Sequence, residues 1–531
     1  MRLTQPIRQG IPPVAVQPAN LSAWITSRTV PSVTALVVMA CTALGLTWAA
    51  GVPAQATTAR RAAVPAATAG VERIRLIAAQ DSITVPSVQG EVDFDPGIWV
   101  ASLGAALELR VQREEYGAPV TVTQVIHPPG GRARFRRLPS WAVDGFDGLR
   151  AFLRVRVTDL HGRTVFRQLT NVCLDSPNPQ RAVPDSSLTD PYPQTCAFDP
   201  FPLALVEGIA RGWAVDPYSF YFKPATIVLL KPGSYQVTAQ ITSRFTRLMD
   251  ISGPDAIARV RMRVVNASGC CTGQVRGSRH AARAGRMARP LPPLLDAPLL
   301  TRIPRSDLPD LIALPAWGIF TQRGRRRDLL VFNATVWVGG ASPLDVEGFR
   351  HDGSPVMQAY QYFWHDGRII GRVRAGTIGF DRRKGHNHWH FEQFAQYQLL
   401  NAARTLSVRS HKQGFCIAPS DPVNLLLPGA VWQPSAIGLV GQCGVPTALW
   451  VQEYLPVGWG DTYTQAVAGQ AFDITSLPDG TYYIEITANP EHLLREQDPG
   501  NDISLRKIIL GGTPGHRTVK VPPWHGIDRE P

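Results

Sequence analysis

The chain lacks the compositional features that identify several common classes of protein. Glycine and proline contribute 46 residues each to the 531, a share too small for a collagenous or low-complexity chain. None of the seven cysteines has the CxxC spacing of a zinc or redox site, and beyond the amino-terminal segment no apolar run is long enough to cross a bilayer. The length therefore predicts about two to four packed domains.

Lysine is also scarce, although the chain is basic. Only six of its 54 basic residues are lysines, and the formal net charge is +13. Residues 1–56 account for +3 of this charge and residues 272–328 for +7. A charge concentrated in two segments predicts no nucleic-acid surface spread over the folded domains; it supports at most a contact between the second segment and an anionic cell envelope.

The first 56 residues have the pattern of an export signal. They contain three arginines and no acid, then the uncharged apolar run Val33–Ala50, then Ala54-Gln55-Ala56 at a candidate cleavage point. We interpret residues 1–56 as a signal peptide; the alternative is that the apolar run is retained as a membrane anchor. Both interpretations place the remainder outside the cytoplasm, so a secreted protein is expected.

Without Cys41 in that segment, an even number of cysteines remains in an oxidising compartment, which predicts disulfides. Cys416 is expected to pair with Cys443 because the two are close in sequence. Some pairing is also expected among four earlier cysteines, with the connectivity left open: Cys173, Cys196, Cys270 and Cys271.

The first half of the mature chain is predicted to be a β-sandwich-like domain. After a flexible leader over residues 57–90, apolar residues alternate through residues 91–271, as in Leu107–Val111. Arginine, alanine and proline then dominate residues 272–306, which favours an extended linker.

A second β-sandwich-like domain is predicted over residues 307–513, followed by a tail at 514–531. The β-rich run Leu329–Val338, ended by two glycines, is its clearest strand. Helices are expected to be few, and Glu392–Leu406 is the best candidate. The fold class predicted for the whole chain is therefore mainly β, with two sandwich-like domains joined by a basic, proline-rich linker.

Three histidines alternate in the motif His386-Asn387-His388-Trp389-His390. In a strand, alternate residues project to one face, so the three imidazoles converge and predict a metal site for Zn, Cu, Fe or Ni. Fully extended, they would span about 13 Å, so the strand must bend to share one ion. A binuclear zinc hydrolase is disfavoured because Trp389-His390 stands where an Asp-His pair is needed. Whether the site is catalytic or structural stays open at this point.

Two further segments follow the histidines in the chain. His411-Lys412-Gln413-Gly414-Phe415-Cys416 contains one of the rare lysines, and Asp461-Thr462-Tyr463 contains a tyrosine near a turn. Taken alone, such a lysine is most simply a surface residue. Together with Tyr397–Leu400 and Phe472–Thr475, however, the ordered motifs HxHxH, HKxxFC and DTY resemble the lysyl oxidase family.

The resemblance covers about residues 307–512 and implies a β-sandwich copper amine oxidase. In that family the HxHxH histidines hold copper, which here are His386, His388 and His390. The lysine of HKxxFC and the tyrosine of DTY cross-link into lysyl tyrosylquinone, here Lys412 and Tyr463.

The activity implied is oxidative deamination of primary amines, either peptidyl lysine or small amines, to aldehydes with O₂, with release of H₂O₂ and NH₃. Animal members carry a histidine where this chain has Gln396, so the catalytic base is unassigned and His411 is only a weak candidate. Few cysteines and this departure suggest a bacterial-type member. The alternative function is a non-catalytic exported protein that binds copper or a surface polymer; the physiological amine and the oligomeric state are left open.

An oxygen-rich loop gives a second metal hypothesis. The loop has the hard ligands that calcium prefers, and it resembles a family loop that binds calcium together with an Asp-Leu pair. The candidate ligands are Asp310, Leu311, Glu496, Asp498, Asn501 and Asp502. An ordinary solvated turn is the alternative.

Overall fold

The fold is taken from a computed structural model. The structure describes residues 73–128, 130–218, 226–267, 297–324, 326–351, 353–382, 387–410, 414–434, 443–464 and 470–528. These residues are mainly β and contain a single α-helix, α1 (Ser243–Leu248), with short 3-10 turns at Ser140–Ala142 and Arg305–Asp307. The predicted fold class, mainly β with few helices, is confirmed.

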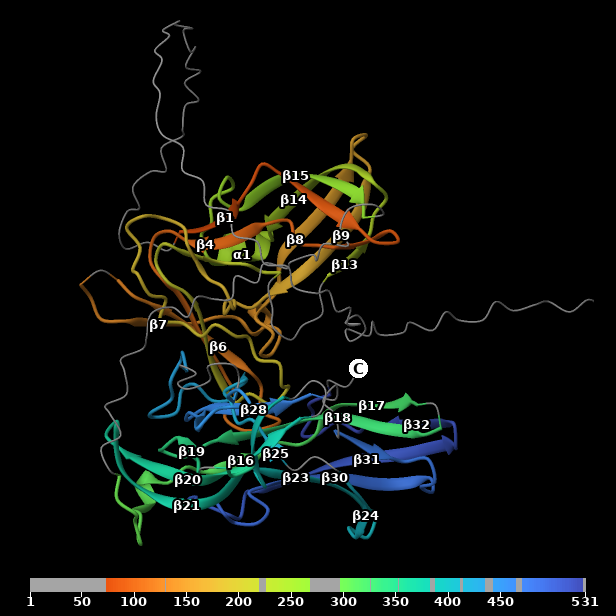
Figure 1. Cartoon of the computed structure of the whole chain (residues 1–531). Coiled ribbons are helices and arrows are strands. Elements are labelled where there is room, and N and C mark those ends of the chain that lie inside the picture. The colour runs from red at the N-terminus through yellow and green to blue at the C-terminus, as the bar shows by residue number, and fades with distance from the viewer. Residues whose placement is uncertain are drawn as a thin grey trace, which may run out of the picture. The chain divides into compact units, whose positions relative to one another are not determined.

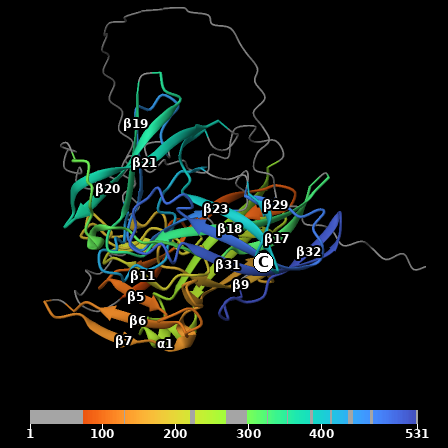
Figure 2. The ribbon, with the colours of Figure 1, turned by 90° about the horizontal axis from the view of Figure 1, so that it is seen from below.

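Before residue 268, the described strands form four sheets (Figures 1 and 2). The first has the order β1 (Ile74–Ala78), β4 (Ile98–Ser102), β12 (Trp213–Val215) and β10 (Gln180–Arg181). The second has the order β11 (Ala204–Ile209), β5 (Leu107–Gln112), β6 (Thr121–Ile126) and β7 (Arg134–Arg137). The third pairs β13 (Ile227–Leu229) with β3 (Glu91–Asp93). The fourth has the order β2 (Ser82–Ser87), β15 (Ile257–Asn266), β14 (Gly233–Ile241), β8 (Leu149–Asp159) and β9 (Thr164–Val172).

After residue 296, the described strands form three sheets. One follows β16 (Leu311–Ala313), β18 (Asp328–Val338), β28 (Trp459–Tyr463) and β26 (Asp421–Pro422), with β17 (Trp317–Arg323) and β29 (Ala471–Asp473) also on β18. The next has the order β25 (Gly414–Phe415), β22 (His388–Glu392), β21 (Arg368–Asp381), β20 (Val356–His365), β19 (Leu344–Arg350) and β27 (Trp450–Leu455). The last has the order β24 (Leu406–Arg409), β23 (Ala395–Asn401), β30 (Gly480–Ala488), β31 (Ile503–Thr513) and β32 (His516–Lys520).

The predicted helix over Glu392–Leu406 is wrong. That segment forms β23 and leads into β24, which pair as antiparallel strands. Burial alternates with a period of two along β23, since Tyr397 and Leu399 are buried while Gln396 and Gln398 are half-buried. This is the period of a strand and not of a helix.

The predicted ends of the two β regions also need correction. Residues 74–87 belong to the expected flexible leader, but they form β1 and β2, which pair with β4 and β15. Buried side chains of Ile74 and Leu76 explain why this segment is ordered. At the other end, β32 lies in the expected tail and pairs with β31.

The chain divides into two compact units, residues 1–65 and 66–531, and every described residue lies in the second. Among the described residues, no helix is long and apolar enough to cross a membrane. The apolar run Val33–Ala50 lies outside them, so the signal peptide and its alternative anchor stay predictions, as do the two domains and their linker.

Both disulfides in the described part of the chain join residues close in sequence. The expected Cys416–Cys443 pair is confirmed, and Cys173 pairs with Cys196. Cys270 and Cys271 lie outside the described residues. The Cys416–Cys443 bond matters for the site because Cys416 follows β25 directly.

Backbone hydrogen bonds join the first β region to the second. The N–H of Leu203 donates to the carbonyl of Val423 at 2.7 Å, and the N–H of Leu425 donates to the carbonyl of Ala204 at 2.7 Å. These bonds join the start of β11 to the loop after β26, so backbone hydrogen bonds connect the two β regions directly.

Asp421 is the central polar group of this junction. Its buried carboxyl accepts the N–H groups of Phe198 at 2.9 Å and Asp199 at 2.8 Å, and the hydroxyl of Thr462 at 3.3 Å. Burial, and then the neighbouring Asp199, raise the pKa of Asp421 well above its usual value. A single buried side chain thus connects the first β region to β28.

We expect Asp421→Ala to lower the free energy of unfolding by about 2–4 kcal/mol, because buried donors lose their acceptor. Asp421→Asn keeps one acceptor oxygen and should cost less, about 1 kcal/mol. Thermal and urea unfolding of the two variants beside the parent protein measure this. Equal stability of Asp421→Ala and the parent would contradict the assignment.

Candidate active site

Two of the three motif histidines lie on the short strand β22. His388 is half-buried and His390 is 3% exposed. Their ring centroids are 4.7 Å apart at an interplanar angle of 69°, so both imidazoles lie on the same side of the strand, as their alternation predicts. The Nδ1 of His390 lies 3.5 Å from a carboxylate oxygen of Asp381 on the neighbouring strand β21. His386 lies outside the described residues.

The segment that follows Lys412 runs directly beside this histidine strand. Strand β25 pairs with β22, with Phe391 opposite Phe415 and Glu392 opposite Gly414. A Cβ at Gly414 would lie 3.0 Å from the Cβ of His390. Glycine therefore permits the close approach of the two strands. Lys412 and His411 lie outside the described residues, and Gly414 is two positions after Lys412 in the chain.

Tyr463 reaches the same segment from the end of β28. Its hydroxyl donates to the carbonyl of Cys416 at 2.9 Å and accepts the N–H of Cys416 at 2.6 Å. The ring of Phe415 meets the Tyr463 ring edge-on, with centroids 4.8 Å apart. The structure thus brings β22, β25 and β28 together, which carry or flank all three motifs.

The environment of Tyr463 disfavours ionisation. Burial raises the pKa of its hydroxyl well above the usual value, and the charges of Asp461 and Glu453 raise it further. The N–H of Cys416 opposes this rise only in part. Burial and the neighbouring carboxyls therefore favour the neutral phenol, whose oxygen accepts the N–H of Cys416.

Sequence reasoning missed Glu453, which lies on β27. Its buried carboxyl accepts the N–H of Phe391 at 3.1 Å through one oxygen and the N–H of Ile417 at 3.0 Å through the other. Burial raises the pKa of Glu453 well above its usual value. Glu453 thereby fixes the end of the histidine strand relative to the segment after β25. Its only signal in the sequence is an acid at a buried position of the strand Trp450–Leu455.

The surroundings of Gln396, which stands where animal relatives have a histidine, do not identify a catalytic base. Gln396 accepts a 2.5 Å hydrogen bond from Gln398 on the same strand. Tyr397, its neighbour, is buried and packs edge-on against Phe415 and Phe332. The tyrosine of this motif is therefore a packing residue, and Gln396 lies on the other face of β23.

The two segments of the expected calcium site come together. Asp310 accepts the N–H of Asp498 at 3.1 Å and the side-chain amide of Asn501 at 3.1 Å. The N–H of Leu311 donates to Glu496 at 3.3 Å. The Asp-Leu pair at the start of β16 thus contacts the oxygen-rich loop before β31.

Acidic groups in this loop are crowded. Burial, together with the charge of Asp502, raises the pKa of Glu496 to about 8, and burial also raises the pKa of Asp502. The side-chain oxygen of Asn501 is buried without a hydrogen-bond partner, and the buried carboxyl of Asp502 interacts with that of Glu496. As the described side chains stand, no group of three or more His, Cys, Asp or Glu residues is arranged to hold a metal ion.

Comparison with known proteins identifies relatives of part of the chain. No family model matches the chain. Lysyl oxidase homolog 4 of Mus musculus is 28% identical over 138 residues, which are 26% of this chain and 16% of that protein. Lysyl oxidase homolog 2 of Rattus norvegicus is 25% identical over 182 residues, which are 34% of this chain and 18% of that protein.

Lysyl oxidase homolog 2 of Gallus gallus is 24% identical over 178 residues, which are 33% of this chain and 18% of that protein. The chain therefore spans less than a fifth of the length of these relatives. The similarity supports the resemblance to the lysyl oxidase family that the three motifs indicate.

Proposed function

We propose that this protein is a secreted, copper-dependent amine oxidase. It would convert primary amines and water, with O₂, to aldehydes, H₂O₂ and NH₃, through a lysyl tyrosylquinone formed from Lys412 and Tyr463. The main support for the proposal is that described residues of the HxHxH, HKxxFC and DTY motifs lie in contact. Gly414 lies against His390, and the next residues, Phe415 and Cys416, hold Tyr463.

The residues present fit a copper site. His388 and His390 offer two imidazoles on one side of β22, and His386 would complete a three-nitrogen set that favours Cu(II). Copper bound there would supply the redox chemistry that converts Tyr463 to a quinone. Asp381 beside the Nδ1 of His390 would orient that ring, as carboxylates commonly do for metal-binding histidines.

The protein's own contribution is orientation. The N–H of Cys416 and the ring edge of Phe415 fix the Tyr463 ring. The carboxyl of Glu453 accepts the N–H groups of Phe391, at the end of the histidine strand, and of Ile417, next to Cys416. These hydrogen bonds hold Tyr463 against Phe415 and Cys416, which follow Lys412 by three and four positions in the chain.

Replacement of the cofactor lysine tests the reaction. Lys412→Arg should remove quinone staining and amine-dependent H₂O₂ release from copper-loaded protein, because arginine has no amine that can form the cross-link. Lys507→Arg, at an exposed position of β31, is the matched control and should keep both signals. Quinone that persists in Lys412→Arg would contradict the cofactor assignment. Copper uptake by the parent protein without any quinone would favour the non-catalytic alternative.

Loss of a histidine tests the metal site separately. His388→Ala should bind substoichiometric copper and form no quinone, since the open position leaves too few nitrogen ligands. His516→Ala, at an exposed position of β32, should keep full copper. Copper content by elemental analysis, beside the quinone absorbance, measures both. Full occupancy in His388→Ala would overturn the ligand set.

We also propose that Asp310, Glu496 and Asp502 bind calcium, with Asp498, Asn501 and Leu311 beside them. The support is the contact between the two segments, the buried side-chain oxygen of Asn501 that lacks a hydrogen-bond donor, and the close carboxyls of Glu496 and Asp502. Calcium prefers such oxygen ligands and would relieve repulsion among the crowded carboxylates.

Calcium should therefore raise the thermal unfolding midpoint of the parent protein. Free calcium at about 100 times its Kd would add about 2.7 kcal/mol to the stability. Asp502→Asn should reduce this shift, whereas Glu491→Gln, at an exposed position earlier in the same loop, should keep it. An equal calcium shift in Asp502→Asn and the parent would exclude Asp502 as a ligand.

A further inference from the structure

The outer face of the sheet β2-β15-β14-β8-β9 is strongly basic. Along β15 and β8, exposed arginines alternate with buried valine, methionine or alanine side chains that face the core. Strand β9 adds one more exposed arginine to the same face. The six residues of this arginine face are Arg154, Arg156, Arg167, Arg259, Arg261 and Arg263.

The strand register places these side chains together. Arg156 of β8 lies opposite Arg167 of β9 and, on its other side, opposite Thr238 of β14. Thr238 in turn lies opposite Arg259 of β15. Residues directly opposite in antiparallel strands share a face, so one row crosses the sheet as arginine, arginine, threonine and arginine.

The spacing of the charges follows from strand geometry. Alternate residues on β15 are about 6.7 Å apart, and β15 lies two strand spacings, about 9.6 Å, from β8. Arg154, between Gln240 and Leu169, continues the row pattern on one side. The arginine face is therefore a grid of positive charges at separations below or near the Debye length of about 8 Å at physiological salt.

Acidic side chains do not neutralise this grid. Within the described part of the chain, none of the six guanidinium groups makes an ion pair or a side-chain hydrogen bond. Two acids lie at the edge of this face. Asp81 precedes β2 and accepts the N–H of Arg261 through its backbone carbonyl, and Asp159 ends β8, where it pairs with Arg163 at 3.1 Å. The outward positions between the arginines hold uncharged polar residues such as Gln236, Thr238 and Gln240.

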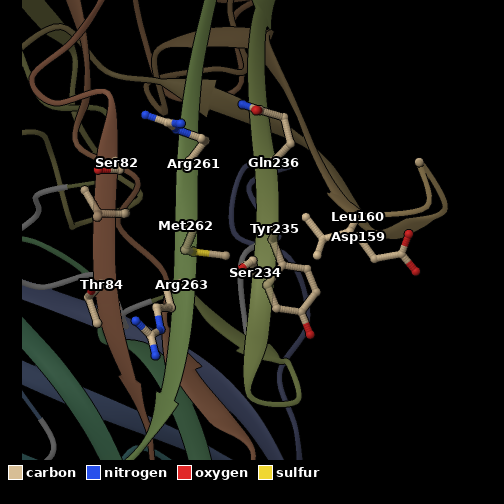
Figure 3. Close-up of a pocket in the computed structure, with 12 residues that line it drawn as sticks. Ser82, Thr84, Asp159, Leu160, Ser234, Tyr235, Gln236, Arg261, Met262 and Arg263 are labelled. Carbon is tan, nitrogen blue, oxygen red and sulfur yellow. The ribbon is translucent and has the colours of Figure 1, made fainter.

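A pocket of about 500 Å³ lies at one end of the arginine face (Figure 3). Arg261 and Arg263 extend to one side of β15 and Met262 to the other in this view. The pocket combines these cations with hydroxyl and amide groups, which belong to Ser82, Thr84, Ser234 and Gln236. Its lining also includes Asp159 and Tyr235. Such a lining offers hydrogen bonds to sugar hydroxyls beside positive charges for anionic groups.

We propose that the arginine face binds a linear anionic polysaccharide. Repeated carboxylate or sulfate groups match a flat grid of arginines, which pair with both in a bidentate manner. The interleaved glutamine and threonine side chains suit sugar hydroxyls. A single-stranded nucleic acid fits less well, because its binding sites stack bases on aromatic rings, and the outward positions of these five strands hold no aromatic residue.

This inference is independent of the amine oxidase proposal, because the arginine face shares no residue with the candidate active site. It also revises the view from the sequence, in which the net charge lies in the amino terminus and in residues 272–328. Acidic residues of the first β region offset most of these positive charges in the net charge, but within the described part of the chain no ion pair joins them to the six arginines.

The test uses full-length secreted protein and three probes: heparin for sulfate, polygalacturonate for carboxylate and neutral dextran. Affinity electrophoresis should show binding to at least one anionic polymer, weakening with added salt, and none to dextran. The triple variant Arg259→Gln, Arg261→Gln, Arg263→Gln should weaken binding about tenfold or more.

The matched control removes the same charge from another exposed strand region. Arg132→Gln, Arg134→Gln and Arg137→Gln, in and before β7, should change affinity by less than about threefold. Equal loss in the two triple variants would show a general charge effect and overturn the proposal. So would tighter binding of oligo-dT than of both anionic polysaccharides, or retained binding in the β15 variant with an unchanged unfolding midpoint.

Discussion

The structure depends on the buried carboxyl of Asp421. This side chain accepts backbone N–H groups of Phe198 and Asp199 from the first β region and the hydroxyl of Thr462 from the second. Thr462 immediately precedes Tyr463 on β28. A carboxyl buried at such a junction is stable only while its donors are present, so the first β region supports the strand that presents the candidate cofactor tyrosine.

A second buried acid organises the candidate site from the opposite side. Glu453 accepts N–H groups from the end of the histidine strand and from the segment after β25. With Gly414 closely packed on His390 and Cys416 bonded to Tyr463, three chain segments distant in sequence are held within contact of one another. Two buried carboxyls, Asp421 and Glu453, therefore hold the strands that carry the motif histidines and Tyr463.

The first β region has two faces with different roles. Its junction with the second region is held by buried hydrogen bonds, whereas the outer face of the sheet β2-β15-β14-β8-β9 is open and carries unpaired arginines. An amine oxidase attached to a polysaccharide would act on amines near that polymer. The arginine face and the candidate active site would then combine localisation with catalysis in one chain.

The sequence by itself determined the β class, the Cys416–Cys443 disulfide and the resemblance to the lysyl oxidase family, because alternation, proximity and ordered motifs are local properties. It failed at Glu392–Leu406, where apolar residues fit a loose helical spacing but strand pairing with β30 decided the conformation. Only the tertiary structure revealed Glu453, Asp421 and the arginine face. Each of these depends on which residues from distant strands become neighbours, and no pattern within a single segment contains that information.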